Sequence, residues 1–255
     1  MNRVKLVGLC VGVTFAVGAV VSAPASALPE FGRCVAKAGG KYKENTCQKK
    51  LAGGGFERLK GVGAILKTGF TSASGKVVFE NAAGARVECE TGTDRGVYKA
   101  PTAVEHVMFM FRECKEPALG VECKTPGAAL GEIITRELKG KLGYINKPKK
   151  EVGLSLTPAV KNGIFVEFEC GAGVLKFVVA GKAGDSVIAA IIPVNIMTIN
   201  FILTFKQAGG VNIPAKFAVG AVDVLEVSVN GGAFEPVGLT MEDLITNEEE
   251  IEIFA

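Results

Sequence analysis

The sequence contains no tryptophan, only three tyrosines and a single histidine, His106. A serine or cysteine nucleophile usually needs a histidine base, so this scarcity leaves little room for a catalytic triad. It also rules out a metal site built from several histidines. His106 lies in an apolar run between Val104 and Met108, and we expect it to be a core residue. The lack of tryptophan and tyrosine argues against a surface that stacks on sugars or on nucleic-acid bases.

Several familiar site motifs are also missing. No Cys-x-x-Cys pair is present, so we do not expect a zinc site. There is no Gly-x-Ser-x-Gly turn and no EF-hand spacing, and the glycines 53–55 are not followed by the Lys-Ser/Thr of a phosphate-binding loop. We therefore predict no catalytic, cofactor-binding or metal residues and no nucleic-acid partner.

The first 27 residues carry the clearest signal that is present. A short basic start with Arg3 and Lys5 leads into an uncharged stretch over 6–21, and Ala25-Ser26-Ala27 follows. This order is typical of a secretory signal peptide. We predict a signal peptide over 1–27 and one secreted domain over 28–255, outside the cell or at its surface, with no membrane span after cleavage.

Charge is unevenly distributed along the chain. Removing Arg3 and Lys5 takes the formal net charge from +3 to +1, so no global attraction to nucleic acid is expected. Residues 28–67 carry nine bases and three acids, whereas residues 216–255 carry one base and nine acids. The two ends either pair within the fold or meet a partner. The candidate partners are an anionic wall polymer and a second copy of the chain.

Six cysteines remain once Cys10 leaves with the signal peptide. An even number in an exported chain predicts three disulfides, although six cysteines allow 15 pairings. Cys34 and Cys47 flank a short loop, as do Cys114 and Cys123, and Cys89 and Cys170 each lie on the apolar face of an alternating run. We therefore propose the pairs Cys34–Cys47, Cys114–Cys123 and Cys89–Cys170.

Short apolar runs broken by glycine, Asn-Gly and proline favour strands with tight turns over helices. The expected strands are 76–81, 85–91, 132–145, 152–156, 164–170, 174–180, 224–229 and 250–254. The fold class predicted is all-β, an antiparallel β-sandwich or flattened barrel stapled by disulfides, with few short helices.

Two segments allow a second interpretation. Val104, Val107 and Phe111 recur at helical spacing after a capping-box sequence, yet the run is rich in β-formers and we favour a strand. A short helix is also possible at 240–245. The 19 uncharged residues of 187–205 approach the length of a membrane helix, but Pro193 interrupts them, and two buried strands fit better.

Paired carboxylates could hydrolyse glycosides without histidine. Glu88 and Glu90 lie on either side of Cys89 in one expected strand, and Glu167 and Glu169 lie in the expected strand that ends at Cys170. If these strands were close, the four carboxylates would share a surface, but a solvated sheet face is the expectation. The same applies to Lys147, Lys149 and Lys150, which we expect to form a hydrated loop.

A set of short motifs occurs in order along the chain. They are Pro29-Glu30-Phe31-Gly32-Arg33-Cys34, Gly40-Lys41-Tyr42, Cys47, Gly96-Val97-Tyr98, Cys123-Lys124-Thr125-Pro126-Gly127, Gly131-Glu132-Ile133, Gly143-Tyr144 and Thr246-Asn247-Glu248-Glu249. Over nearly the whole chain after residue 27, this set resembles uncharacterised secreted six-cysteine proteins of soil actinobacteria. The resemblance implies secretion, six paired cysteines and one continuous unit, and it brings no catalytic residues.

The function expected from the sequence is that of an extracellular or cell-surface binding or structural protein. The alternatives are a secreted carboxylate-dependent hydrolase and a self-assembling surface protein. In the last case the acidic C-terminal strand would pair with the basic N-terminal part of a neighbour.

Overall fold

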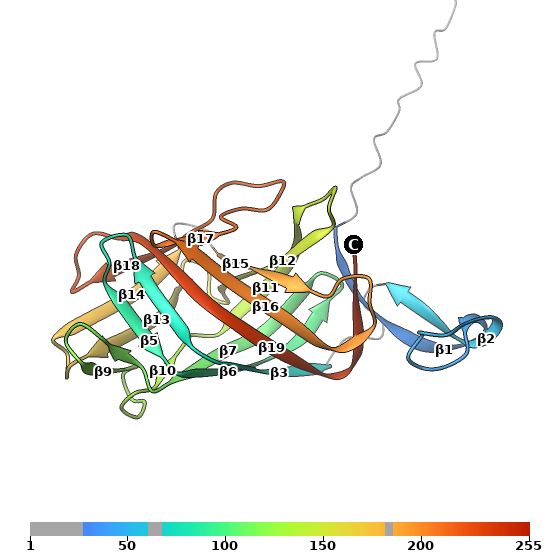
Figure 1. Cartoon of the computed structure of the whole chain (residues 1–255), viewed down its shortest axis with the longest axis horizontal. Helices are drawn as coiled ribbons and strands as arrows, with labels where there is room; N and C mark the ends of the chain where they lie inside the picture. Colours follow the sequence, from blue (N-terminus) through green and yellow to red (C-terminus); the bar gives the residue numbers. More distant parts are fainter. Residues whose placement is uncertain (1–27, 61–67, 182–185) are drawn as a thin grey trace, which may run out of the picture.

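A computed structural model describes residues 28–60, 68–181 and 186–255 (Figure 1). The expected signal peptide, with Cys10, lies outside these described residues. Within them every regular element is a β-strand, so the all-β prediction is confirmed and the few expected short helices are not found. No helix in this part of the chain is long and apolar enough to cross a membrane.

Eight antiparallel strands close into a barrel. In the order in which they pair, they are β3 (Gly69–Ser74), β6 (Thr91–Ala100), β7 (Ala103–Arg112), β11 (Leu138–Asn146), β12 (Glu151–Pro158), β15 (Val187–Ile192), β16 (Thr198–Ala208) and β19 (Glu235–Phe254), which returns to β3. Buried and exposed residues alternate along β6 and along much of β19, as expected when one face of each strand lines a barrel interior.

A second set of strands also leads back to β19. The pairing runs through β4 (Val77–Asn81), β5 (Arg86–Cys89), β8 (Lys115–Glu116), β9 (Val121–Lys124), β13 (Ile164–Cys170), β14 (Leu175–Gly181) and β18 (Leu225–Val229), and then to the first residues of β19. We call this set the second ring. The 20-residue β19 pairs with β4 near its start and with β3 farther along, so it belongs to both the barrel and the second ring.

One hydrophobic core fills both rings. Phenylalanines from different strands meet in it: Phe79 of β4 packs edge-on against Phe111 of β7, and Phe168 stacks on Phe177 across the β13–β14 pair. Burying each phenylalanine contributes roughly 1.5–3 kcal/mol. The predicted hairpin of 76–81 with 85–91 is confirmed as β4 and β5.

The ambiguous segment at 102–111 is strand β7, as favoured from its composition. Its helical spacing has a different cause. His106 has φ +56°, and the pairing register with β11 shifts at the same place, which marks a β-bulge. The bulge lets Val104 and Val107, three residues apart, both face the core. Residues 240–245 are likewise strand, within β19.

The apolar stretch 187–205 forms two strands, β15 and β16, with Pro193 in the connection between them. This confirms the interpretation as two strands. Two short strands extend the barrel sheet: β10 (Ile133–Ile134) pairs with β7, and β17 (Val211–Ile213) pairs with β16.

The first two strands form a hairpin that projects from the barrel (Figure 1). β1 (Glu30–Tyr42) pairs with the end of β19 only through its first four residues, Glu30 to Arg33, and β2 (Lys50–Lys60) pairs with β1 alone. Beyond Arg33, β1 and β2 therefore pair only with each other, and this part of the hairpin projects from the barrel.

Candidate functional site

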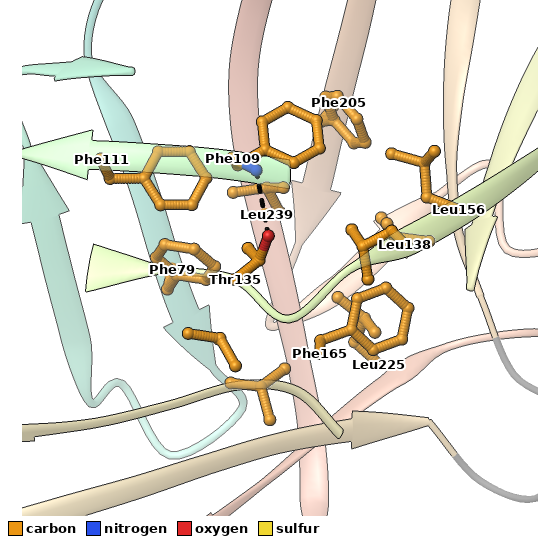
Figure 2. Close-up of a pocket in the computed structure, with 13 residues that line it drawn as sticks. Phe79, Phe109, Phe111, Thr135, Leu138, Leu156, Phe165, Phe205, Leu225 and Leu239 are labelled. Atoms are coloured by element: carbon orange, nitrogen blue, oxygen red, sulfur yellow. Dashed lines mark hydrogen bonds between the residues drawn. The ribbon is translucent and has the colours of Figure 1, made fainter. Parts of the chain in front are cut away.

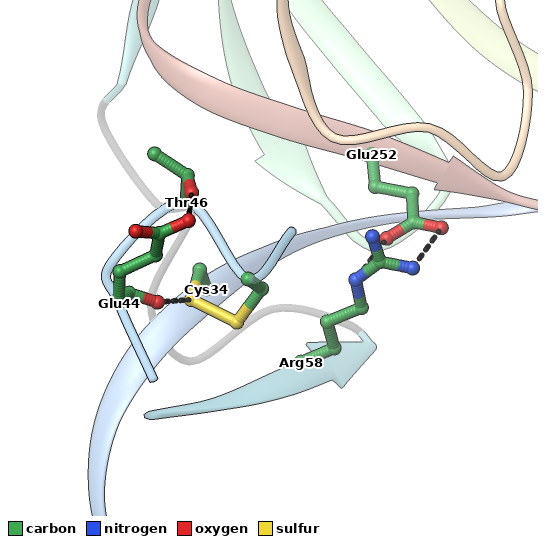
Figure 3. The surroundings of a disulfide bond; sticks show 6 residues. Cys34, Glu44, Thr46, Arg58 and Glu252 are labelled. Atoms are coloured by element: carbon green, nitrogen blue, oxygen red, sulfur yellow. Dashed lines mark hydrogen bonds and ion pairs between the residues drawn. A yellow bond between two sulfur atoms is a disulfide. The ribbon is translucent and has the colours of Figure 1, made fainter. Parts of the chain in front are cut away.

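The base of the β1–β2 hairpin is fixed to the barrel by two ion pairs. Arg33 Nη1 lies 2.7 Å from Glu249 Oε1, and Arg58 Nη1 donates a hydrogen bond of 3.2 Å to Glu252 Oε1 (Figure 3). Glu252 is 2% exposed. Burial raises the pKa of this carboxyl, and Arg58 and then Lys60 oppose the shift. The basic N-terminal and acidic C-terminal segments therefore pair within one chain.

A disulfide and a small apolar cluster hold the hairpin together. Cys34 and Cys47 are bonded, and the Cys34 Sγ lies 3.6 Å from the carbonyl oxygen of Glu44 (Figure 3). Tyr42 and Cys47 are buried against Met197 from the β15–β16 connection. The hairpin is thus braced both internally and against the barrel.

Two glycines let the hairpin strands approach closely. A Cβ on Gly40 would lie 2.1 Å from the carbonyl oxygen of Phe56, and a Cβ on Gly54 would lie 2.0 Å from that of Tyr42. Such contacts are impossible for any other residue without a backbone shift.

Positive charge gathers in the part of the hairpin that follows Val35, which we call the hairpin tip and define as residues 36–55. It contains five lysines, Lys37, Lys41, Lys43, Lys49 and Lys50, and all are exposed. One acid, Glu44, lies in the same segment, so the formal net charge of the tip is +4.

The acids near the tip neutralise it only in part. Glu57, just beyond the tip, lies 3.8 Å from Lys37 Nζ and 3.7 Å from Lys41 Nζ, and Glu44 lies 3.8 Å from Lys49 Nζ. Glu57 is largely buried, but the lysine ends of all three pairs are exposed, and ion pairs open to water are worth at most about 1 kcal/mol each. The ammonium groups thus remain free to exchange these partners for other anions.

The barrel interior holds a second group of polar side chains. Asp94 on β6 and Asp243 on β19 are 5% and 1% exposed, and β3 lies between them with Ser72 and Ser74 facing inward. The backbone N–H of Asp94 donates to Ser72 Oγ at 3.2 Å. The two aspartates are close enough that the charge of Asp243 acts on Asp94, and no hydrogen bond joins their carboxyl groups to other described residues.

Burial dominates the electrostatics of this pair. Burial, reinforced by the neighbouring Asp243 charge, raises the pKa of Asp94 well above its ordinary range. Burial also raises the pKa of Asp243. The nearby phenol of Tyr98 donates to Asn247 Oδ1 at 2.6 Å, and burial followed by the Asp94 charge raises its pKa as well. We call Asp94 and Asp243 the aspartate pair.

A small apolar cavity lies where the core residues of the two rings meet (Figure 2). Its volume is about 30 Å³, and Phe79, Phe165, Phe205 and Leu239 are among the side chains that line it. Its one polar lining residue, Thr135, uses its hydroxyl oxygen to accept the Phe109 N–H at 3.0 Å. This volume is about that of one water molecule, so the cavity is a packing gap rather than a ligand pocket.

The structure corrects two of the three proposed disulfides. Cys34–Cys47 is confirmed, but Cys89 is bonded to Cys114 and Cys123 to Cys170. These four cysteines lie side by side on or next to β5, β8, β9 and β13. The predicted partners Cys114 and Cys123 are bridged instead by a backbone hydrogen bond, since the Cys123 N–H donates to the Cys114 carbonyl at 2.9 Å. Cys114 is bonded to Cys89 of β5, and Cys123 is bonded to Cys170 of β13. The Cα–Cα distances are 3.9 and 4.0 Å.

The single histidine is also placed differently from the expectation. His106 is not a core residue: its side chain is 65% exposed, and its Nδ1 lies 2.8 Å from Glu137 Oε1. The β7 bulge turns it outward. Its partner is the carboxylate of Glu137 and not a serine or cysteine nucleophile, so this imidazole has the geometry of a surface ion pair.

The four carboxylates considered for hydrolysis do not form a pair across a cleft. Glu88 is held by Lys76 and Arg86 at 2.6 and 2.7 Å, and the hydrogen bond from Lys76 lowers its pKa. Glu90 lies near Lys115, Glu167 lies near Arg136, and Glu169 pairs in register with Lys124 and Lys176. Glu90 and Glu167 thus lie on a solvated sheet face, as expected from the sequence, whereas the Glu88 side chain is only 13% exposed. Lys147, Lys149 and Lys150 form the exposed β11–β12 turn, as expected.

Among the described residues, no group of three or more histidine, cysteine, aspartate or glutamate side chains is placed to hold a metal ion. Sequence reasoning missed the aspartate pair, because Asp94 and Asp243 lie 149 positions apart and only the barrel closure brings them together. Comparison of the chain with protein-family models, with curated proteins and with solved structures finds no match in any of the three.

Proposed function

We propose that the protein is an extracellular or cell-surface binding module that holds an anionic wall polymer on the tip of its β1–β2 hairpin. The observation that carries this proposal is the tip itself: a braced projection with five exposed lysines and one acid. Lysine ammonium groups recognise phosphate or carboxylate repeats as point charges and do not require a shaped pocket.

The extracellular setting is part of the proposal. Three disulfides are typical of proteins that fold in an oxidising compartment, and the N-terminal sequence is typical of an exported chain. An ordered hairpin also loses little conformational freedom on binding, which favours affinity.

Self-assembly through the two charged ends has less support. The edge of β19 that would receive a neighbour's basic strand is paired with β1 of the same chain, and Arg33 and Arg58 already meet Glu249 and Glu252. Part of the charge complementarity that motivated this alternative is therefore satisfied within one chain.

The test uses a matched pair of charge variants. The triple variant Lys37→Gln/Lys43→Gln/Lys49→Gln removes three charges from the hairpin tip, and Lys147→Gln/Lys149→Gln/Lys150→Gln removes three from the β11–β12 turn. Binding to an immobilised glycerol-phosphate polymer is measured over a series of salt concentrations. Each lysine near an anionic surface contributes about 1 kcal/mol, so the tip variant should bind at least about 100-fold more weakly. The dependence of its binding on salt concentration should also be less steep.

The β11–β12 variant should bind like the unmodified protein. Equal losses in both variants would mean that only net charge matters, and binding unaffected by either would remove the hairpin tip from the function. Circular dichroism of each variant checks that the strands are intact.

A further inference from the structure

Within the part of the chain that the structure describes, no cationic side chain balances the aspartate pair. No lysine, arginine or histidine is buried anywhere in the described residues. The neighbouring inward residues in register are apolar: Phe109 lies beside Asp94, and Leu203 lies beside Asp243. Two carboxyl groups in such surroundings cannot both remain charged without a positive partner. The partner is either a proton or a bound cation.

Unused hydrogen-bonding capacity points beyond the two acids. The Ser74 hydroxyl, on a residue 9% exposed, has no hydrogen-bond partner, and it lies on β3 directly opposite Asp243. Among the described residues, no donor forms a hydrogen bond to any of the four aspartate carboxyl oxygens. Four inward-facing groups on three adjacent strands therefore place oxygen atoms at neighbouring positions of the barrel interior.

We propose that the barrel interior binds one hard divalent cation, of the Ca²⁺ class, through the carboxylates of Asp94 and Asp243 and the hydroxyl oxygens of Ser72 and Ser74. The donor set consists only of oxygen, and all six cysteines of the described chain are in disulfides, so a soft metal has no preferred ligand there. Ca²⁺ takes six to eight oxygens in flexible geometry, and water completes the shell.

The cation would enter as the chain folds. The ligands come from β3, β6 and β19, which are brought together only when β19 closes the barrel, and all four are at least nine-tenths buried. Binding is therefore coupled to folding, and release from the folded protein should be slow. This site is separate from the hairpin tip, so it stands or fails independently of the proposed polymer binding.

The first experiment uses the unmodified protein. Full-length secreted protein, with disulfides intact, is unfolded and refolded in CaCl₂, in MgCl₂ or in EGTA, then desalted. We expect one Ca²⁺ retained per chain by elemental analysis, a higher thermal midpoint with CaCl₂ than with EGTA, and a smaller shift with MgCl₂. Terbium should replace Ca²⁺ and give luminescence on excitation of the nearby Tyr98, which CaCl₂ then suppresses.

Variants then locate the site. Asp243→Asn should abolish retention, the midpoint shift and the terbium signal. Glu242→Gln removes one acid from the adjacent, outward-facing position of β19 and should leave all three unchanged. A refolded unmodified protein that retains no metal and has the same midpoint in CaCl₂ and EGTA would overturn the proposal, leaving a shared proton as the balancing charge. This result is obtained with the unmodified protein, so it contradicts the proposal even if Asp243→Asn misfolds.

Discussion

Single residues in this protein show how much depends on which face a strand presents. His106 was expected in the core because apolar residues surround it in the sequence, yet it is exposed. The alternation of inward and outward residues is interrupted at the β7 bulge, and a bulge leaves little trace in a sequence. The buried positions Val87, Cys89 and Cys170, by contrast, were predictable, because buried and less buried residues alternate over 86–89 and over 166–170.

The aspartate pair leads to a prediction of pH dependence for the protein freed of divalent cations by a chelator. Both pKa values are raised in the folded state, so the folded protein binds more protons than the unfolded chain. Their contribution to stability is complete below the ordinary aspartate pKa and is lost as pH rises through the raised values. The free energy of unfolding should therefore fall from about pH 4 toward alkaline pH.

Asp243→Asn tests this directly in urea denaturation at several pH values. The amide can still hydrogen-bond to Asp94 and adds no charge, so the variant should be more stable than the unmodified protein at pH 8 by about 1 kcal/mol or more. At pH 4 the difference should shrink. Tyr98 is the other titratable group facing the pair, and its raised pKa keeps it neutral throughout. Parallel pH curves for the two proteins would contradict the assignment.

At the scale of elements, the three disulfides show what short-range spacing can predict and what it cannot. Local spacing was enough to predict the Cys34–Cys47 bond, because a short loop keeps its two ends together. The other two disulfides join strands whose order around the second ring is set by long-range pairing. Short-range spacing could not reveal that order, and so it favoured the wrong partners. The hairpin's projection from the barrel also had no sequence signal.

A pair of neighbouring glycines on β2 allows a controlled test of the hairpin. Gly54→Ala places a methyl group against the Tyr42 carbonyl, whereas a Cβ on Gly55 meets no atom within 4 Å. We expect Gly54→Ala to destabilise the hairpin by roughly 1–3 kcal/mol and Gly55→Ala to have little effect. Hydrogen exchange of the β1 and β2 amides measures this difference. Faster exchange in both variants, or in neither, would show that the close approach is not needed.

For the whole molecule, the decisive feature is that two rings share one core and one strand. The all-β class and the antiparallel barrel were predictable from short alternating runs and frequent turns. The second ring was not, because its pairings join β4, β9 and β18 over long stretches of chain. A shared core predicts that the two rings unfold together.

Two leucines of β19 test this cooperativity. Leu239 lines the cavity between the rings and is 6% exposed, whereas Leu244 on the same strand is 48% exposed. Leu239→Ala should cost about 2–5 kcal/mol and lower the exchange protection of β12 in the barrel and β14 in the second ring equally. Leu244→Ala should change both by less than about 0.5 kcal/mol. Loss of protection in one ring alone would show that the rings are separate folding units.

The position of β19 in the chain order also constrains how the protein matures. Both rings need this strand as their closing edge, and it follows all the other described strands along the chain. While residues 235–254 are still inside the ribosome, neither ring can close. Until then the preceding strands can form hairpins but not a finished core. A chain with this topology therefore completes its core only after residues 235–254 have emerged, so core assembly follows synthesis of the other described strands.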